Sequence, residues 1–174
     1  LVVAGNFNLT NVDELFDILV NIGQHPKEVS DTVTIIEKIG HFLDQENSRI
    51  FKEQIEKGVD NKEISSQIAK HLNIENILKN SSSDWDGGYT MAGLLGHGDA
   101  FVIRDPNGIR PAFWYEDEEV FVVTSERPVI QTAFNVKWEA INELKAGNAL
   151  IIKKDNSFKE VEINPPKEIK KCSF

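Results

Sequence analysis

The sequence has 174 residues, of which 40% are hydrophobic and 27% charged. This length fits one domain that buries about 70% of its unfolded surface, and the composition excludes a mainly disordered chain. The formal net charge of -9 repels phosphate backbones and anionic lipid headgroups, so we expect no nucleic acid and no membrane among the partners.

Cysteine usage and hydropathy indicate the compartment. No run of about 20 apolar residues occurs, which a membrane-spanning helix requires. The single cysteine, Cys172, cannot form an internal disulfide, and no secretory leader opens the sequence. These features favour a reducing, cytoplasmic location.

Both ends of the chain have the pattern of interior sequence. The apolar run 1–5 predicts a buried strand that leads directly into the asparagine-rich stretch 6–11. Domains seldom begin this abruptly, so we expect upstream sequence to be missing. The proline pair Pro165-Pro166 and the charged residues after it predict an exit linker, so we expect a cut at this end as well.

The first half of the chain is predicted to be mainly helical. Asn11 is a suitable N-cap for a helix with one apolar face, and Gly23 can end that helix. Ser30 or Asp31 can cap a second helix. Two or three further helices are expected over about 49–79.

After residue 80 the composition changes to turn formers followed by short apolar runs. These runs predict a short helix over 126–134 and strands over 89–95, 100–104, 112–115, 120–124, 149–153 and 158–163. Helices followed by strands with short connections predict an α+β fold with mainly antiparallel sheets.

The densest motif is an octad between two predicted strands, Arg104-Asp105-Pro106-Asn107-Gly108-Ile109-Arg110-Pro111. A tight hairpin connection is the simplest interpretation, because Pro106 presets φ and Gly108 adopts conformations that other residues resist. Arg104, Asp105 and Arg110 could also form an ion-pair network that holds a neighbouring loop.

The octad resembles the Arg-Asp-Pro-x-Gly-Ile-Arg-Pro motif of amidophosphoribosyltransferases, in their class II glutamine amidotransferase domain. Other segments resemble the family in the same order: Gly88-Tyr89, Thr124-Ser125-Glu126, Lys145-Ala146-Gly147-Asn148 and Cys172-Ser173-Phe174. The resemblance implies the four-layer α-β-β-α sandwich of N-terminal nucleophile hydrolases. It implies a partial type 2 domain over 1–164, with a helical insert over about 49–83, and a linker over 165–174 toward a missing phosphoribosyltransferase domain.

The asparagine-rich stretch resembles the family's His-Asn-Gly-Asn-Leu-x-Asn segment, with Gly5 in place of the histidine and Phe7 in place of the glycine. The resemblance assigns the oxyanion hole to the Asn6 side chain and the Phe7 backbone N–H. Such donors can lower a barrier by about 3 kcal/mol. Without the resemblance, the stretch reads as a turn that caps a helix.

Ser30-Asp31-Thr32 resembles the start of the family's Ser-Asp-Thr-Glu segment, with Val33 in place of the glutamate. The resemblance implies that Asp31 binds the α-amino group of glutamine. Asp31 also reads as a helix N-cap with a favourable place in the helix dipole, and both roles could coexist.

The family's nucleophile is an N-terminal cysteine, whose thiolate attacks the amide and whose α-amine serves as base. This chain begins with Leu1, and Cys172 is better explained as a packing residue. The family's arginine for the glutamine carboxylate lies upstream, so no residue is assigned to it. We expect the chain alone to be inactive.

Other candidate sites are weak. His97 reads as a hairpin residue, and the other histidines lack metal-ligand spacing. No metal or other cofactor is expected in this chain, because the resemblance places Mg²⁺ and phosphoribosyl diphosphate in the missing domain. Three tryptophans are expected to fill the core or the sheet interface: Trp85, Trp114 and Trp138.

The resemblance implies a parent glycosyltransferase of purine biosynthesis, which hydrolyses glutamine and transfers the ammonia to phosphoribosyl diphosphate. Its implied partners are glutamine, the phosphoribosyltransferase domain and further copies in a homo-oligomer. One alternative is a non-catalytic regulatory or interaction module, because Gly5, Phe7 and Val33 depart from the family. Another is a class II amidotransferase that acts on sugar phosphates or aspartate, which fits the octad less well.

Overall fold

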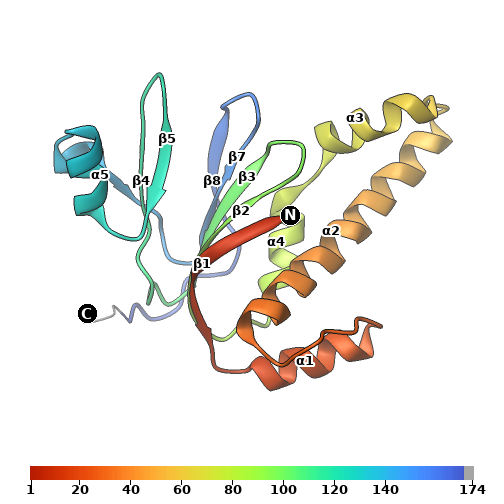
Figure 1. The fold of residues 1–174 in the computed structure, drawn as a ribbon, viewed down its shortest axis with the longest axis horizontal. Coiled ribbons are helices and arrows are strands. Elements are labelled where there is room, and N and C mark those ends of the chain that lie inside the picture. The colour runs from red at the N-terminus through yellow and green to blue at the C-terminus, as the bar shows by residue number, and fades with distance from the viewer. Residues whose placement is uncertain (171–174) are drawn as a thin grey trace. The chain divides into compact units, whose positions relative to one another are not determined.

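The computed structural model describes residues 1–170, and Figure 1 shows its helices and strands. The chain divides into two units. One unit joins Leu1–Thr10 to the chain from Asp86 onward, and the other is Asn11–Trp85.

The unit Asn11–Trp85 consists of helices in the described structure (Figure 1). The long α2 contacts each of the other three helices. The helices are α1 (Val12–Asn21), α2 (Asp31–Glu56), α3 (Asn61–His71) and α4 (Ile74–Ser82).

The predicted first helix is confirmed, although its first turn differs from the expectation. α1 begins after Asn11, but the Asn11 side chain makes no capping bond and instead donates to the carbonyl of Asp84 at 2.9 Å. Gly23, with φ of 86°, follows the end of α1 as predicted. Its left-handed backbone suits glycine at this position.

The second helix starts as predicted but is longer. Ser30, not Asp31, is its N-cap, and the Ser30 hydroxyl accepts a hydrogen bond from the Val33 N–H at 3.3 Å. α2 continues through Arg49, so the further predicted helices begin only at Asn61 and Ile74.

Two charged side chains on α2 are buried, and each has a charged partner. Lys38 forms an ion pair with Asp84. Glu46 accepts hydrogen bonds from Arg49, which lower the pKa of the Glu46 carboxyl. The pairing matters because an unpaired buried charge is strongly destabilising.

The other unit contains two antiparallel sheets, as predicted (Figure 1). The larger has the strand order β1-β2-β3-β7-β8 and the smaller the order β5-β4-β6. β6, with two residues, was not predicted because so short a strand has no detectable alternation. The strands are β1 (Val2–Leu9), β2 (Gly87–Leu94), β3 (Ala100–Arg104), β4 (Phe113–Glu116), β5 (Phe121–Thr124), β6 (Asn142–Glu143), β7 (Asn148–Ile152) and β8 (Phe158–Glu162).

The two sheets share an apolar core. Val102 of β3 and Leu150 of β7 pack in one cluster with aromatic residues of the other sheet. Trp114 of β4 stacks on Phe121 with ring centroids 5.6 Å apart. Consecutive residues of a strand face opposite sides, so Phe113, which precedes Trp114, faces away from this core. On the side of Phe113, α5 (Arg127–Phe134) contacts β4 and β5.

The tryptophan prediction is correct for two of the three residues. Trp114 lies at the sheet interface and Trp85 is buried. Trp138 is 57% exposed, which contradicts the prediction. It lies in the short 3₁₀ helix η1 (Trp138–Ala140), where the Arg127 guanidinium lies 5.9 Å from its ring.

The prediction of a buried first strand is wrong. β1 extends to Leu9, and most of its residues are exposed. The reason is its position, because β1 is an edge strand that pairs only with β2 among the described strands.

The octad is a crossover, and the hairpin interpretation is wrong. β3 lies in the larger sheet and β4 in the smaller, so residues 105–112 carry the chain from one sheet to the other. The fully buried Asp105 carboxylate holds this crossover. It accepts hydrogen bonds from the N–H groups of Ile109 and Arg110 at 2.9 Å and of Tyr89 at 3.3 Å. Gly108 has a φ of 63°, as its predicted role requires.

Arg104 binds the same crossover through carbonyl oxygens. Its guanidinium donates to the carbonyls of Arg110 at 2.7 Å and Gly108 at 3.2 Å. Its acidic partner is Glu143 of β6 at 2.9 Å, and Asp105 instead serves backbone N–H groups. The prediction of an ion-pair network among Arg104, Asp105 and Arg110 is therefore wrong.

Residues 165–170, which were predicted as part of a linker, are hydrogen-bonded to the crossover. The Lys167 N–H donates to the carbonyl of Pro106, and the Lys170 N–H to that of Asn107, both at 2.8 Å. The Asn107 side chain donates to the carbonyl of Glu168 at 3.0 Å. These bonds fix the segment against the octad.

A second buried aspartate, Asp99, joins the β2–β3 and β7–β8 hairpins. Its carboxylate accepts hydrogen bonds from the Lys153 ammonium and from the Lys154 N–H at 2.9 Å. His97 Nε2 lies 3.0 Å from Asp99 Oδ2, so His97 is a hairpin residue as predicted. Burial raises the pKa of Asp99, but Lys153, His97 and Lys154 together outweigh burial and lower it.

Asp105→Asn should lower the free energy of unfolding by about 2 kcal/mol, because one buried carboxylate oxygen becomes an amide donor facing backbone N–H groups. Urea titration measures the change. Asp155→Asn is a matched control, because exposed Asp155 also accepts hydrogen bonds within a turn, from Ser157. Equal losses in both variants would contradict the role of Asp105.

Asp99 should make stability depend on pH. A carboxyl whose pKa is lower in the folded state stabilises the fold above its unfolded pKa of about 3.9 and loses that effect as pH falls through the folded pKa. Urea titrations across pH should therefore show a stability gap between the unmodified chain and Asp99→Asn that closes in acid. A stability gap at Asp99 that is constant with pH would contradict this assignment.

Candidate functional site

A cavity of about 310 Å³ lies between the two sheets, beside β1. Its wall combines residues of β1, β2, β3 and β5 with the end of the octad. Polar side chains among its lining residues are Asn6, Thr90, Arg110, Thr124 and Ser125.

Asn6 enters this cavity because of the register between β1 and β2. Asn6 pairs with Thr90 in the antiparallel ladder, and paired residues place their side chains on the same face of a sheet. Both residues line the cavity. Figure 1 shows β1 and β2 side by side along their length.

The Phe7 N–H points away from β2, toward the unpaired side of the edge strand. Thr10 and Asp86 lie opposite each other just beyond the end of the β1–β2 ladder. The Thr10 N–H donates to the carbonyl of Asp86 at 2.8 Å, so these two residues form a hydrogen-bonded pair. In an antiparallel ladder, hydrogen-bonded pairs alternate with pairs that are not hydrogen-bonded. Counting back from Thr10 and Asp86, Asn6 and Thr90 form a hydrogen-bonded pair, whereas Phe7 and Tyr89 form a pair that is not hydrogen-bonded.

The hydrogen bonds of β3 support this alternation. The carbonyl of Tyr89 accepts from the Asp105 N–H at 2.8 Å, so the peptide groups of Tyr89 face β3 and not β1. The Phe7 N–H therefore lies next to the Asn6 side chain without a ladder partner in β2. Sequence reasoning named both donors but had no register from which to derive this direction.

The Phe7 side chain does not enter the cavity. Consecutive strand residues point to opposite faces, and Phe7 is absent from the cavity lining that includes Asn6. Its backbone pairs regularly in β1 and has no positive φ. A phenylalanine is thus compatible with the local backbone at this position.

Gly5 precedes these donors at a point of close backbone contact. A Cβ atom at Gly5 would lie 2.5 Å from the carbonyl oxygen of Thr90 and 2.6 Å from the Cβ of Met91. No larger residue fits here unless the backbone shifts.

Arg110 is the one ionisable residue among those that line the cavity. Its backbone is fixed at both polar groups, since the N–H donates to Asp105 and the carbonyl accepts from Arg104 and from the Thr90 hydroxyl. Its Nε is buried and has no hydrogen-bond partner among residues 1–170. The guanidinium makes the electrostatic potential of the cavity positive, which favours a negatively charged group.

Sequence reasoning assigned Arg110 to a structural motif and missed its place at the cavity. It also treated Thr124 and Ser125 only as part of a matching segment, although both line the cavity. The signal was absent because the crossover between sheets, which brings these residues together, does not follow from local sequence.

The structure does not bring all predicted site residues together in one unit. Asp31 belongs to the helical unit, where it is the half-buried first residue of α2 after the Ser30 cap. Asn6 and Phe7 lie in the unit of the two sheets. Cys172 and the segment Cys172-Ser173-Phe174 lie outside the described residues.

Metal and membrane features are also absent from the part of the chain that the structure describes. Over residues 1–170, no group of three or more His, Cys, Asp or Glu side chains could hold a metal ion. None of the described helices combines the length and apolar character needed to cross a bilayer.

Comparison with known proteins identifies an amidophosphoribosyltransferase among the relatives of this chain. No protein-family profile matches the chain. Amidophosphoribosyltransferase of Lachancea kluyveri is 37% identical over 81 residues, which are 44% of this chain and 15% of that protein. The chain thus spans a small part of the length of this curated relative.

Two solved structures share the fold. The glutamine phosphoribosylpyrophosphate amidotransferase of B. subtilis, complexed with ADP and GMP, has a TM-score of 0.62 and 25% identity, covering 93% of this chain and 29% of that chain. A structure described as the allosteric regulatory enzyme of purine biosynthesis has a TM-score of 0.59 and 25% identity, covering 93% of this chain and 28% of that chain. The α+β architecture with antiparallel sheets matches the N-terminal nucleophile hydrolase fold of these amidotransferases. The predicted resemblance is therefore confirmed: in sequence and in fold, the chain is similar to part of the glutamine amidotransferase domain of amidophosphoribosyltransferases.

Proposed function

We propose that the chain is the oxyanion-binding part of a glutaminase domain, in a protein that hydrolyses glutamine and transfers the ammonia to phosphoribosyl diphosphate. One observation carries this proposal. The Asn6 side chain lines a cavity, and the neighbouring Phe7 N–H has no ladder partner in β2.

The two donors suit the chemistry of amide hydrolysis. When a nucleophile attacks the amide carbon of glutamine, negative charge develops on the amide oxygen. Preorganised N–H donors stabilise that charge without the reorganisation that water requires. Arg110 adds a positive potential in the same cavity.

The reaction also needs a nucleophile, a group that binds the substrate's α-amino group, and an acceptor domain. The nucleophile would be a cysteine thiolate outside this chain, with its α-amine as base. Asp31 would bind the α-amino group of glutamine through its carboxylate. A phosphoribosyltransferase domain would bind phosphoribosyl diphosphate with Mg²⁺, in a cytoplasmic homo-oligomer.

Ammonia release from glutamine by the gene-length protein tests the proposal. Release should stop after thiol alkylation, because the alkylated cysteine can no longer attack the amide. The 174-residue chain should release no ammonia. Release that resists alkylation, or release by the 174-residue chain, would contradict this mechanism.

Asn6→Ala in the gene-length protein should lower kcat for glutamine hydrolysis by about 100- to 1,000-fold, because one oxyanion donor is removed. Asn8→Ala is a matched control, since Asn8 is also exposed on β1 and lies two residues along the same face. Steady-state ammonia assays measure both variants. A similar loss in both would indicate general damage to β1.

Gly5 favours the alternative of a non-catalytic interaction module. The backbone contacts around Gly5 leave no space for the histidine that the family carries there. No ammonia release from a folded gene-length protein would favour this alternative.

A further inference from the structure

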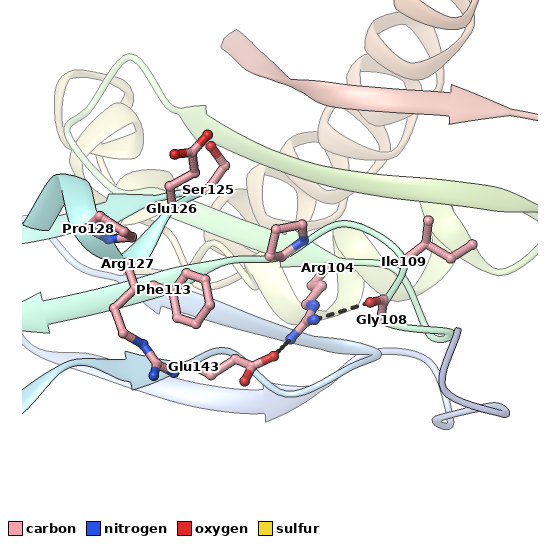
Figure 2. A pocket seen from close by; sticks show the side chains of 10 residues that line it. Arg104, Gly108, Ile109, Phe113, Ser125, Glu126, Arg127, Pro128 and Glu143 are labelled. Carbon is pink, nitrogen blue, oxygen red and sulfur yellow. Dashed lines mark hydrogen bonds and ion pairs between the residues drawn. The ribbon is translucent and has the colours of Figure 1, made fainter. Parts of the chain in front are cut away.

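A second cavity, of about 470 Å³, lies between the octad and the start of α5 (Figure 2). Its size is within the usual range of small-molecule sites. Its apolar lining includes Ile109 and Pro111 of the octad, Phe113 of β4 and Pro128 of α5. This cavity shares Pro111 and Ser125 with the cavity that contains Asn6, and its other lining residues differ.

Arg127 is a partly buried cation of this cavity that has no anionic partner among residues 1–170. Its guanidinium carbon lies 4.7 Å from the Phe113 ring centroid and 5.9 Å from the Trp138 ring. Its Nε is buried and has no hydrogen-bond partner among residues 1–170. The two rings hold the guanidinium in place by cation–π attraction but offer its Nε–H no acceptor.

The other charges of the cavity do not neutralise Arg127. Glu143 is paired with Arg104 at 2.9 Å. Figure 2 shows that Glu126 and Arg127 extend in opposite directions on either side of Phe113. Arg127 is therefore the available cation in a cavity whose other three charged residues are the paired Arg104 and Glu143, and Glu126.

We propose that this cavity binds a small carboxylate carried on a flat apolar body, with Arg127 as the anchor of the carboxylate. A guanidinium presents two parallel N–H donors that match a carboxylate. The apolar walls formed by Ile109, Pro111 and Phe113 suit an aromatic or branched aliphatic group.

A carboxylate fits this cavity better than a phosphate. A phosphate carries close to two negative charges at neutral pH, whereas a carboxylate carries one. Glu126 and Glu143 are both among the lining residues, so their repulsion grows with the charge of the ligand. One available guanidinium offsets a single charge.

Benzoate is a suitable probe, with benzamide as its neutral counterpart and inorganic phosphate as the alternative anion. NMR titration of the ¹⁵N-labelled 174-residue chain measures binding and locates it. Benzoate should shift the signals of Arg127 Nε, Phe113 and the Trp138 indole, with a Kd of about 1 mM or tighter. Benzamide and phosphate should bind at least about tenfold more weakly.

Variants test the anchor. Arg127→Gln should weaken benzoate binding by about tenfold or more, because the charged donors are lost. Arg127→Lys should also weaken it, because an ammonium lacks the planar fork. Lys167→Gln is the control for net charge: it also removes one positive charge, and Lys167 is not among the residues that line this cavity. The control should bind benzoate as the unmodified chain does.

Several results would overturn the proposal: no shift with benzoate, equal binding of benzamide or phosphate, shifts that do not include Arg127 Nε and Phe113, or full affinity in Arg127→Gln. Circular dichroism shows whether each variant is folded. If Arg127→Gln does not fold, the comparison of benzoate with benzamide on the unmodified chain decides the question. These measurements do not involve glutamine, so they can fail or succeed independently of the proposed glutaminase function.

Discussion

The buried carboxylate of Asp105 is the interaction on which the unit of two sheets depends. It accepts hydrogen bonds from Tyr89 at the start of β2 and from Ile109 and Arg110 in the crossover. One side chain thus accepts hydrogen bonds from backbone donors on both sides of the junction between the sheets. Without it, the N–H groups of Tyr89, Ile109 and Arg110 would lose the acceptor that joins them.

The crossover in turn determines both cavities. Arg110 lines the cavity of Asn6, while Ile109 and Gly108 line the cavity of Arg127. The chain from 165 to 170 is hydrogen-bonded to the same crossover at Pro106 and Asn107. The segment is therefore bonded to the same crossover that supplies lining residues to both cavities.

Local sequence predicted the elements well and their assembly poorly. The alternation of apolar residues located the main strands, and Gly23 and Gly108 have the backbone angles that their turns require. The same turn residues suit a hairpin and a crossover between sheets, so the prediction that the octad forms a hairpin was wrong. The burial of β1 and the direction of the Phe7 N–H depend on which strands are neighbours. That is a long-range property, which neither periodicity nor spacing encodes.

The exposed edge of β1 has a consequence for handling the protein. The geometry that leaves the Phe7 N–H open also leaves the peptide groups of Val3 and Gly5 open along the same side. A row of open peptide groups is a template for another strand, and β1 carries no charged side chain to oppose such pairing. The 174-residue chain should therefore tend to self-associate through β1 at high concentration, so that an oxyanion donor and an aggregation hazard would have the same structural origin.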